Sequence, residues 1–418
     1  MSAGAVRAVP SAGWPAASTP EDYVLGHVRA VLPHRVLDDA RIVVRNGVIE
    51  EVGPHPRGSG CDLDGRGASC VPGLVDVHSD VLARELHPRP GAAMPIGFAL
   101  ATAGSRLRAS GVTTALHGVA FQAMSPVGLP IGSPAATEVV AALDAAPDEA
   151  AGAARDAAPG ATGVLHRVDV RCPDGLAALQ ERIARERAAG RVPVVSHEDH
   201  TPGQGQYADP ATMRRWLVTG EGMTETDAAA HVEALRRSRD ERLGVRDAAL
   251  ARLGELAAGG DIRLFGHDPA TERDIDELAD RGGAVAEFPT TVEAALRARE
   301  RGLDVVAGAP NALRGGSHAG NVSAAELVAL GLVDALASDY LPGSQLAAAV
   351  RLARGGACTL PAAIGLVTSG PAAAIGLDDR GAIAPGLRAD LVVADLDGEW
   401  PHVHAVLTAA QRRSRHGP

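Results

Sequence analysis

The stretch VPGLVDVHSD, residues 71–80, is the first of eight short apolar runs that decide the fold. The other runs begin at Gly111, Val164, Val192, Asp261, Gly282, Leu303 and Leu332. Ala-, Arg- and Glu-rich stretches that favour helix alternate with them. Continuous apolar strands alternating with helices are typical of parallel sheets buried on both faces. Eight such units predict an α/β protein with a closed (β/α)8 TIM-type barrel over residues 71–372, and an active site at the C-terminal strand ends.

Both flanks of this barrel favour β-structure. Residues 40–53, ARIVVRNGVIEEVG, place two β-branched runs around Asn46 and Gly47, the dipeptide best suited to a two-residue hairpin turn. Residues 380–396, RGAIAPGLRADLVVADL, predict another turn and strand. We therefore expect residues 21–70 and 373–418 to form one small β-sandwich domain, and residues 1–20, rich in Ala, Ser and Pro, to be a disordered tail. Residues 209–260 are a long, polar, helix-compatible insertion.

Composition excludes several classes of function. The chain has 418 residues and a net charge of −11 at pH 7, so its surface repels polyanions and a nucleic-acid partner is not expected. It contains no lysine, which excludes a Schiff-base lysine, a Walker A lysine and a carboxylated lysine that bridges two metals. No apolar run approaches the ~20 residues that span a bilayer, and the four cysteines form no CxxC pair. These features predict a cytoplasmic protein without a membrane partner; a homo-oligomer stays open.

Imidazoles and carboxylates gather at the predicted strand ends. His78 and Asp80 end the first run, His200 follows the fourth, His267 ends the fifth and Asp339 ends the eighth. Such donors, supplied by different strands at the end of the barrel where catalysis occurs, are what a divalent metal requires. The alternatives are packed histidines and, for the two acids, caps of the following helices. Because all of them end strands, we interpret the set as a metal site.

The motifs resemble those of the amidohydrolase superfamily. The residues that carry this resemblance are the opening hairpin, PGLVDVHSD on the first strand, SDY on the eighth and the closing strand GAIAPGLRADLVV. Within the superfamily, HEDHTPGQGQY, AEFPTT, GAPNALRGGSHAGN and ASDYLP are similar to the diphosphatases of the carbon–phosphorus lyase pathway. The resemblance runs from about Tyr23 to Ala405. It implies hydrolysis of α-D-ribose 1-methylphosphonate 5-triphosphate, a phosphorylated sugar, to the 5-phosphate and pyrophosphate.

The resemblance also implies roles for individual residues. His78, Asp80, His200, His267 and Asp339 would bind a divalent metal, expected to be zinc, as one or two ions. Asp339 would in addition serve as general base toward the attacking water.

The acid that bridges two ions is less clear from the sequence. The family's third strand carries a His-x-Arg-x-Glu pattern, whereas residues 166–171 here read HRVDVR. Asp169 is the acid nearest to that position and is the predicted bridging ligand, although a displacement by one residue turns a strand side chain to the opposite face. Alternatively, His197, Glu198 or Asp199 completes the site.

The segment ALRGGSHAGN has a composition suited to wrapping an anion with a guanidinium and backbone donors. The predicted phosphate-binding residues in it are Arg314, Gly315, Gly316, Ser317, His318 and Asn321. Thr201, Gln204 and Tyr340 lie beside metal-binding positions and are expected to orient phosphate or ribose oxygens. Two alternative functions are compatible with the same barrel. The first is hydrolysis of an amide or cyclic amide, or deamination, and the second is a catalytically inactive binding protein. A neutral amide gives no reason for an anion-binding loop, so the phosphoanhydride is preferred.

Overall fold

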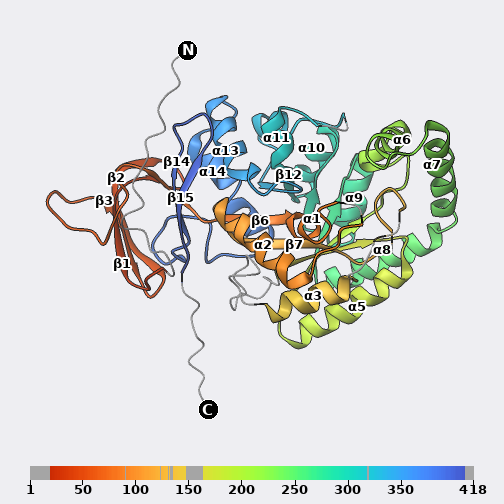
Figure 1. The fold of residues 1–418 in the computed structure, drawn as a ribbon, viewed down its shortest axis with the longest axis horizontal. Coiled ribbons are helices and arrows are strands. Elements are labelled where there is room, and N and C mark those ends of the chain that lie inside the picture. Colours follow the sequence, from red (N-terminus) through yellow and green to blue (C-terminus); the bar gives the residue numbers. More distant parts are fainter. Residues whose placement is uncertain are drawn as a thin grey trace.

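The computed structural model describes residues 19–89, 91–122, 124–129, 131, 135–146, 163–317 and 320–409. It consists of a barrel of strands and helices beside a small β-domain to which both the start and the end of the chain contribute (Figure 1). Residues 1–18 of the predicted tail lie outside the described residues. Among the helices of the described ranges, none combines the length and the apolar character needed to cross a membrane.

The barrel is an eight-stranded parallel sheet whose strands follow one another in chain order. Its strands are β6 (Leu74–Ser79), β7 (Val112–Ala120), β8 (Val164–Asp169), β9 (Val194–Glu198), β10 (Arg263–His267), β11 (Val285–Glu287), β12 (Asp304–Gly308) and β13 (Ala335–Ala337). A parallel bridge between Ser79 and Asp339 joins the last strand region to the first. Each of the eight apolar runs contains one strand, so the predicted barrel is confirmed.

Helices surround this sheet and bury its outer face. They are α1 (Val81–Leu86), α2 (Ile96–Ala109), α3 (Ala136–Ala145), α5 (Pro173–Ala188), α8 (Leu243–Ala258), α9 (Glu272–Asp280), α10 (Val292–Glu300), α11 (Ala309–Arg314), α12 (Ala324–Ala329), α13 (Ser344–Arg354), α14 (Leu360–Gly365) and α15 (Ser369–Ala374). A second apolar cluster combines strand residues such as Val75, Leu116 and Phe265 with Ala372 and Ile375 in and just after α15. The interior is therefore a packed core, which leaves the strand ends free for a site.

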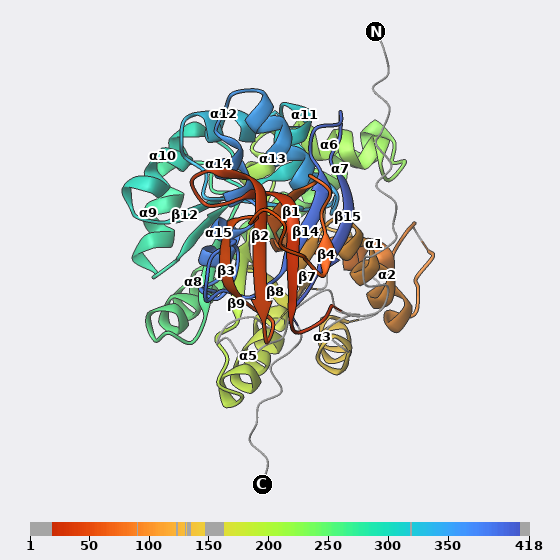
Figure 2. The ribbon, with the colours of Figure 1, turned by 90° about the vertical axis from the view of Figure 1, so that its left-hand side faces the viewer.

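The small domain is one hydrogen-bonded, seven-stranded sheet. Its strands are β1 (Tyr23–Val31), β2 (Val36–Arg45), β3 (Val48–Pro54), β4 (Leu63–Asp64), β5 (Ser69–Pro72), β14 (Leu391–Asp395) and β15 (His402–Leu407). Their order is β15-β14-β5-β1-β2-β3, with β4 on β1. β14 pairs antiparallel with β5, so strands from residues 23–72 and from residues 391–407 lie side by side in one sheet (Figure 2). Asn46 and Gly47 both have positive φ angles, 50° and 69°, as the predicted two-residue hairpin requires.

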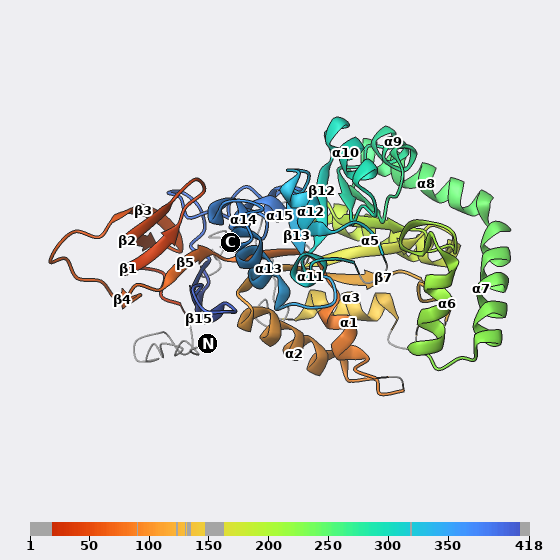
Figure 3. The same ribbon diagram turned by 90° about the horizontal axis from the view of Figure 1, so that it is seen from above.

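The polar insertion contains helices α6 (Pro210–Thr219) and α7 (Glu225–Asp240), preceded by the 3-10 turn η1 (Gly205–Tyr207). Thr224 caps α7, its hydroxyl accepting from the backbone N–H of Asp227. The two helices share a small apolar core that includes Tyr207, Met213 and Val232. They lie at the opposite end of the molecule from the small β-domain (Figure 3).

Candidate active site

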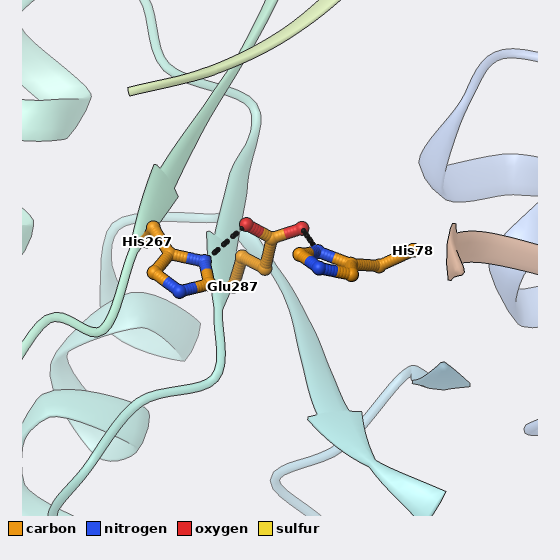
Figure 4. Close-up of side chains that lie close together, drawn as sticks. All are labelled: His78, His267 and Glu287. Atoms are coloured by element: carbon orange, nitrogen blue, oxygen red, sulfur yellow. Dashed lines mark hydrogen bonds and ion pairs between the residues drawn. The ribbon is translucent and has the colours of Figure 1, made fainter. Parts of the chain in front are cut away.

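A buried carboxylate joins two histidines at the centre of the strand ends. Glu287, the last residue of β11, is completely buried. Its Oε1 lies 2.7 Å from Nδ1 of His78 at the end of β6, and its Oε2 lies 2.7 Å from Nδ1 of His267 at the end of β10 (Figure 4). The hydroxyl of Ser196 donates to the same Oε2 at 2.7 Å. Both imidazoles are thus held through Nδ1, which leaves Nε2 to face other groups.

The Nε2 atom of His78 faces a pair of acids. It lies 3.7 Å from Oδ1 of Asp80, and these two residues with Asp339 offer donor atoms within 4.8 Å of one another. The backbone fixes the group, because the N–H of Asp339 donates to the His78 carbonyl at 2.9 Å and the N–H of Asp80 donates to the Asp339 carbonyl at 2.8 Å. Asp339 has φ 53°, a left-handed conformation that is costly for a residue other than glycine and that often marks a functional site.

A second donor group consists of His200, His267 and Asp268. Oδ2 of Asp268 lies 3.4 Å from Nε2 of His267 and 3.9 Å from Nε2 of His200. Glu198, the last residue of β9, places Oε2 3.7 Å from Nδ1 of His200. Each group contains one of the two histidines held by Glu287, so the two groups lie side by side and are joined through that carboxylate.

This donor set fits a divalent metal. Three of its buried atoms have no hydrogen-bond partner: Oε2 of Glu198, Nε2 of His200 and Oδ2 of Asp268. Buried polar atoms are normally paired, because leaving one unpaired costs about 1–3 kcal/mol. Imidazole nitrogens together with carboxylate oxygens are the ligands that zinc and related divalent ions take. A cation bound between His200 and Asp268 would satisfy the last two of these atoms.

Arg167 is a largely buried cation beside the donor set. On β8, its Nη1 donates to Asp80 at 2.8 Å and its Nε donates to the buried carboxylate of Glu198. Burial alone would raise the pKa of both acids, but the guanidinium outweighs it and holds each pKa below its usual value. Both acids are therefore ionised near neutral pH.

Asp339 and His267 both have raised pKa values, for different reasons. Burial, together with the neighbouring charge of Asp80, raises the pKa of Asp339 to about 6. Burial would lower the pKa of His267, but the surrounding carboxylates, Asp268 foremost, raise it to about 9. A carboxyl group with a pKa near 6 can accept and return a proton at neutral pH, as general base catalysis requires.

A cavity of about 240 Å³ opens onto this centre. His78, Asp80, Arg167, His267 and Asp339 line its inner part. The predicted substrate-binding residues Arg314, Ser317, Asn321 and Tyr340 line the same cavity, with Phe288, Pro289 and Leu327 as apolar neighbours. The structure therefore brings four of the predicted metal ligands, His78, Asp80, His267 and Asp339, and four of the predicted substrate-binding residues around one space.

Other predicted substrate-binding residues lie elsewhere. The hydroxyl of Thr201 donates to Asp199 at 2.6 Å and accepts from Nε of Arg239 at 2.7 Å, so it is committed to a buried network. Gln204 lines a smaller neighbouring crevice. Gly315 follows the last residue of helix α11 with φ 81°, and Gly316 comes next. Neither glycine is among the described residues that line the cavity. His318 lies outside the described residues.

Asp169 is also not part of the donor set, which corrects its predicted place as bridging ligand. Both of its oxygens accept from Arg239, at 2.5 and 2.8 Å, at the end of α7. Of the alternatives, Asp199 is bound by Arg171 and Arg239, whereas Glu198 points to His200. Of these two acids, Glu198 is thus the one whose carboxylate faces a histidine of the donor set.

Three members of the site were not singled out from the sequence: Arg167, Asp268 and Glu287. Each stands in a stretch that did attract notice, HRVDVR, GHD and AEFPTT. Glu287 ends β11 and Asp268 directly follows β10, which was the available signal, whereas Arg167 lies two residues before the end of β8. Their side chains contact residues in or just after other strands, and such contacts leave no trace in the local sequence.

The chain is similar to known amidohydrolases. The sequence profile of the amidohydrolase family matches residues 214–405. The chain is 34% identical over 400 residues to the α-D-ribose 1-methylphosphonate 5-triphosphate diphosphatase of Escherichia coli (strain K12), covering 93% of this chain and 99% of that relative.

Solved structures show the same fold at much lower identity. An enamidase superimposes with a TM-score of 0.53 and 17% identity over 95% of this chain and 97% of its own. The N-acetyl-D-glucosamine-6-phosphate deacetylase from Mycobacterium smegmatis does so with a TM-score of 0.52 and 18% identity over 93% of this chain and 99% of its own. At these identities the structural similarity supports only the fold, a barrel with a second domain.

Proposed function

Because the chain belongs to the amidohydrolase superfamily, we propose that it is a metal-dependent hydrolase that cleaves α-D-ribose 1-methylphosphonate 5-triphosphate into the 5-phosphate and pyrophosphate. The identity to the Escherichia coli diphosphatase over nearly its whole length supports this substrate. The observation that carries the proposal is the shared cavity, which is lined by five of the donor residues and by Arg314, Ser317 and Asn321. A cationic side chain beside polar ones suits a triphosphate better than a neutral amide.

The residues that would hold the metal are His78, Asp80, Glu198, His200, His267, Asp268 and Asp339. When bound, a divalent ion activates water and stabilises negative charge on phosphoryl oxygens. Zinc suits this mixture of imidazole and carboxylate ligands.

The chain's own groups would perform the remaining steps. Asp339 takes a proton from the water that attacks the α-phosphorus and returns it to the departing pyrophosphate, while the bond from the α-phosphorus to the bridging oxygen breaks. Arg314 binds the phosphate chain through its guanidinium. Arg167 keeps Asp80 and Glu198 ionised as ligands.

Phosphorus NMR of the zinc-loaded protein with the triphosphate tests this function. We expect pyrophosphate and a 5-monophosphate, and we expect Asp339→Asn to lower kcat by about 10²–10⁴-fold with its circular dichroism unchanged. Asp276→Asn, on the outer helix α9, serves as the matched control and should turn over at the wild-type rate. Release of orthophosphate, or turnover of amides without any phosphorus product, would overturn the proposed reaction.

A further inference from the structure

We propose that Glu287 is a positioning residue that fixes two metal-binding histidines at once, by accepting a hydrogen bond from Nδ1 of each. The inference rests on the metal centre of the proposed function and is independent of its substrate. Glu287 would act through His78 and His267, without touching the metal or the substrate.

The hydrogen bonds of Glu287 support this role. Oε1 accepts from His78 at 2.7 Å, and Oε2 accepts from His267 and from Ser196, each at 2.7 Å. The side chain of Glu287 is completely buried, so no water competes for its oxygens. An ionised carboxylate only accepts hydrogen bonds, and each imidazole must therefore place a proton on Nδ1. Figure 4 shows the carboxylate between the two rings.

The geometry distinguishes this role from direct ligation by Glu287. A zinc ligand nitrogen or oxygen lies about 2.0–2.2 Å from the ion, so two ligands at angles of 90° or more lie about 3 Å or further apart. The separations of 2.7 Å between Glu287 and the two Nδ1 atoms are shorter than that and match hydrogen bonds. The Nε2 atoms, by contrast, lie 3.7 Å from Asp80 and 3.4 Å from Asp268, distances that leave room for a cation.

A single carboxylate that serves two ligands has a specific consequence. His78 belongs to the donor group with Asp80 and Asp339, and His267 belongs to the group with His200 and Asp268. Glutamine in place of Glu287 keeps one acceptor oxygen, but its amide nitrogen donates toward the other ring. That ring must then accept with Nδ1 and carry its proton on Nε2, where it can no longer bind metal. The substitution removes one histidine ligand without altering the histidine itself.

Glu287→Gln therefore tests the proposal, with zinc alone as the probe. In chelator competition we expect its zinc affinity to fall by about 10–100-fold, the usual effect of losing a partner that orients a ligand. Ser196→Ala, which removes the hydroxyl but keeps both histidine contacts, is the comparison and should change the affinity by only about threefold. Thermal melts of the metal-free variants check that both are folded.

Long-range proton–nitrogen NMR of the zinc-loaded wild type provides a readout that needs no variant of Glu287. We expect His78 and His267 each to carry a proton on Nδ1 and bind zinc through Nε2, and His78→Asn assigns one of the two signals. Zinc binding through Nδ1 of either ring would overturn the proposal. So would wild-type affinity in Glu287→Gln, or failure of the wild type to bind zinc. A zinc-bound protein with these tautomers but no diphosphatase activity would overturn only the proposed substrate.

Discussion

Asp169→Asn should weaken the fold and spare the metal centre. Asp169 ends β8, and its carboxylate accepts two hydrogen bonds from Arg239, at 2.5 and 2.8 Å, and one from the backbone N–H of Arg171 at 2.9 Å. Arg239 lies near the end of α7, so the ion pair between Asp169 and Arg239 connects this helix of the insertion to strand β8 of the barrel. Because neither side chain belongs to the donor set, loss of the carboxylate charge should leave metal binding intact.

The size of the effect follows from the burial of the pair. Both side chains are 12% exposed. The energy of this ion pair should therefore lie between that of a surface pair, about 0–1 kcal/mol, and the cost of breaking a buried pair, about 3–5 kcal/mol. Asparagine keeps one acceptor oxygen, and Arg239 retains Asp199 at 3.0 Å and Thr201 at 2.7 Å. We therefore expect a loss of about 2 kcal/mol, which in a protein of this size lowers the melting temperature by about 2–3 °C.

Two measurements distinguish a structural role of Asp169 from a role as metal ligand. Calorimetry of the metal-free protein gives the melting temperature, and elemental analysis after zinc loading gives the metal content. Glu198→Gln is the comparison, because it alters the acid that lies 3.7 Å from His200 and should reduce zinc binding. If Asp169→Asn lost zinc while its metal-free melting temperature stayed unchanged, Asp169 would be a metal ligand and the assignment to Arg239 would be refuted.

Two further predictions concern the cavity and the core. Arg314→Ala should raise the KM for the triphosphate by about 10–100-fold with a smaller change in kcat, because one charge-assisted contact is worth about 1.5–3 kcal/mol. Steady-state kinetics at low and high salt would measure this change in KM. An unchanged KM would contradict the prediction. Burial lowers the pKa of His166 to about 4, so between pH 6.5 and 4 the unfolded chain gains a proton that the folded chain does not. The free energy of unfolding should therefore decrease as the pH is lowered from 6.5 to 4, by up to about 3 kcal/mol from this residue. Urea unfolding of His166→Gln should show a weaker pH dependence of this free energy than the wild type.

The barrel could be predicted because its determinants are local. Each apolar run is long enough for one buried strand, and the polar residue that follows marks the strand end. Even β11 and β13, only three residues each, lay within runs recognisable by composition. The pairing of Asn46 and Gly47 likewise specifies its own turn through φ angles that few other residues adopt.

The choice between Asp169 and Glu198 could not be made from the sequence. The two residues are direct partners in the register of β8 and β9, so both end neighbouring strands at the same level. Their different surroundings depend on two arginines: Arg167 binds Glu198, and Arg239, 70 residues further along the chain than Asp169, binds the other acid. No local pattern connects a strand end to the end of a helix in a distant insertion.

Backbone strain shows why the site becomes defined only when the barrel closes. Asp268, Phe288 and Asp339 all have positive φ angles, between 53° and 56°, which cost of order 1–3 kcal/mol each for residues other than glycine. Each directs its N–H to a carbonyl of the neighbouring barrel strand: Asp268 to Glu287 at 2.8 Å, Phe288 to Val306 at 2.8 Å and Asp339 to His78 at 2.9 Å.

These three hydrogen bonds connect β10 to β11, β11 to β12, and the end of β13 back to β6. The strained conformations are therefore stabilised by strands that meet only in the closed sheet, and the third bond joins residues at opposite ends of the barrel sequence. The same conformations direct the side chains of Asp268 and Asp339 toward the histidines. A substitution that opens the seam between β13 and β6 should accordingly displace Asp339 from Asp80 before it disturbs His200 and Asp268, which depend on the seams around β10.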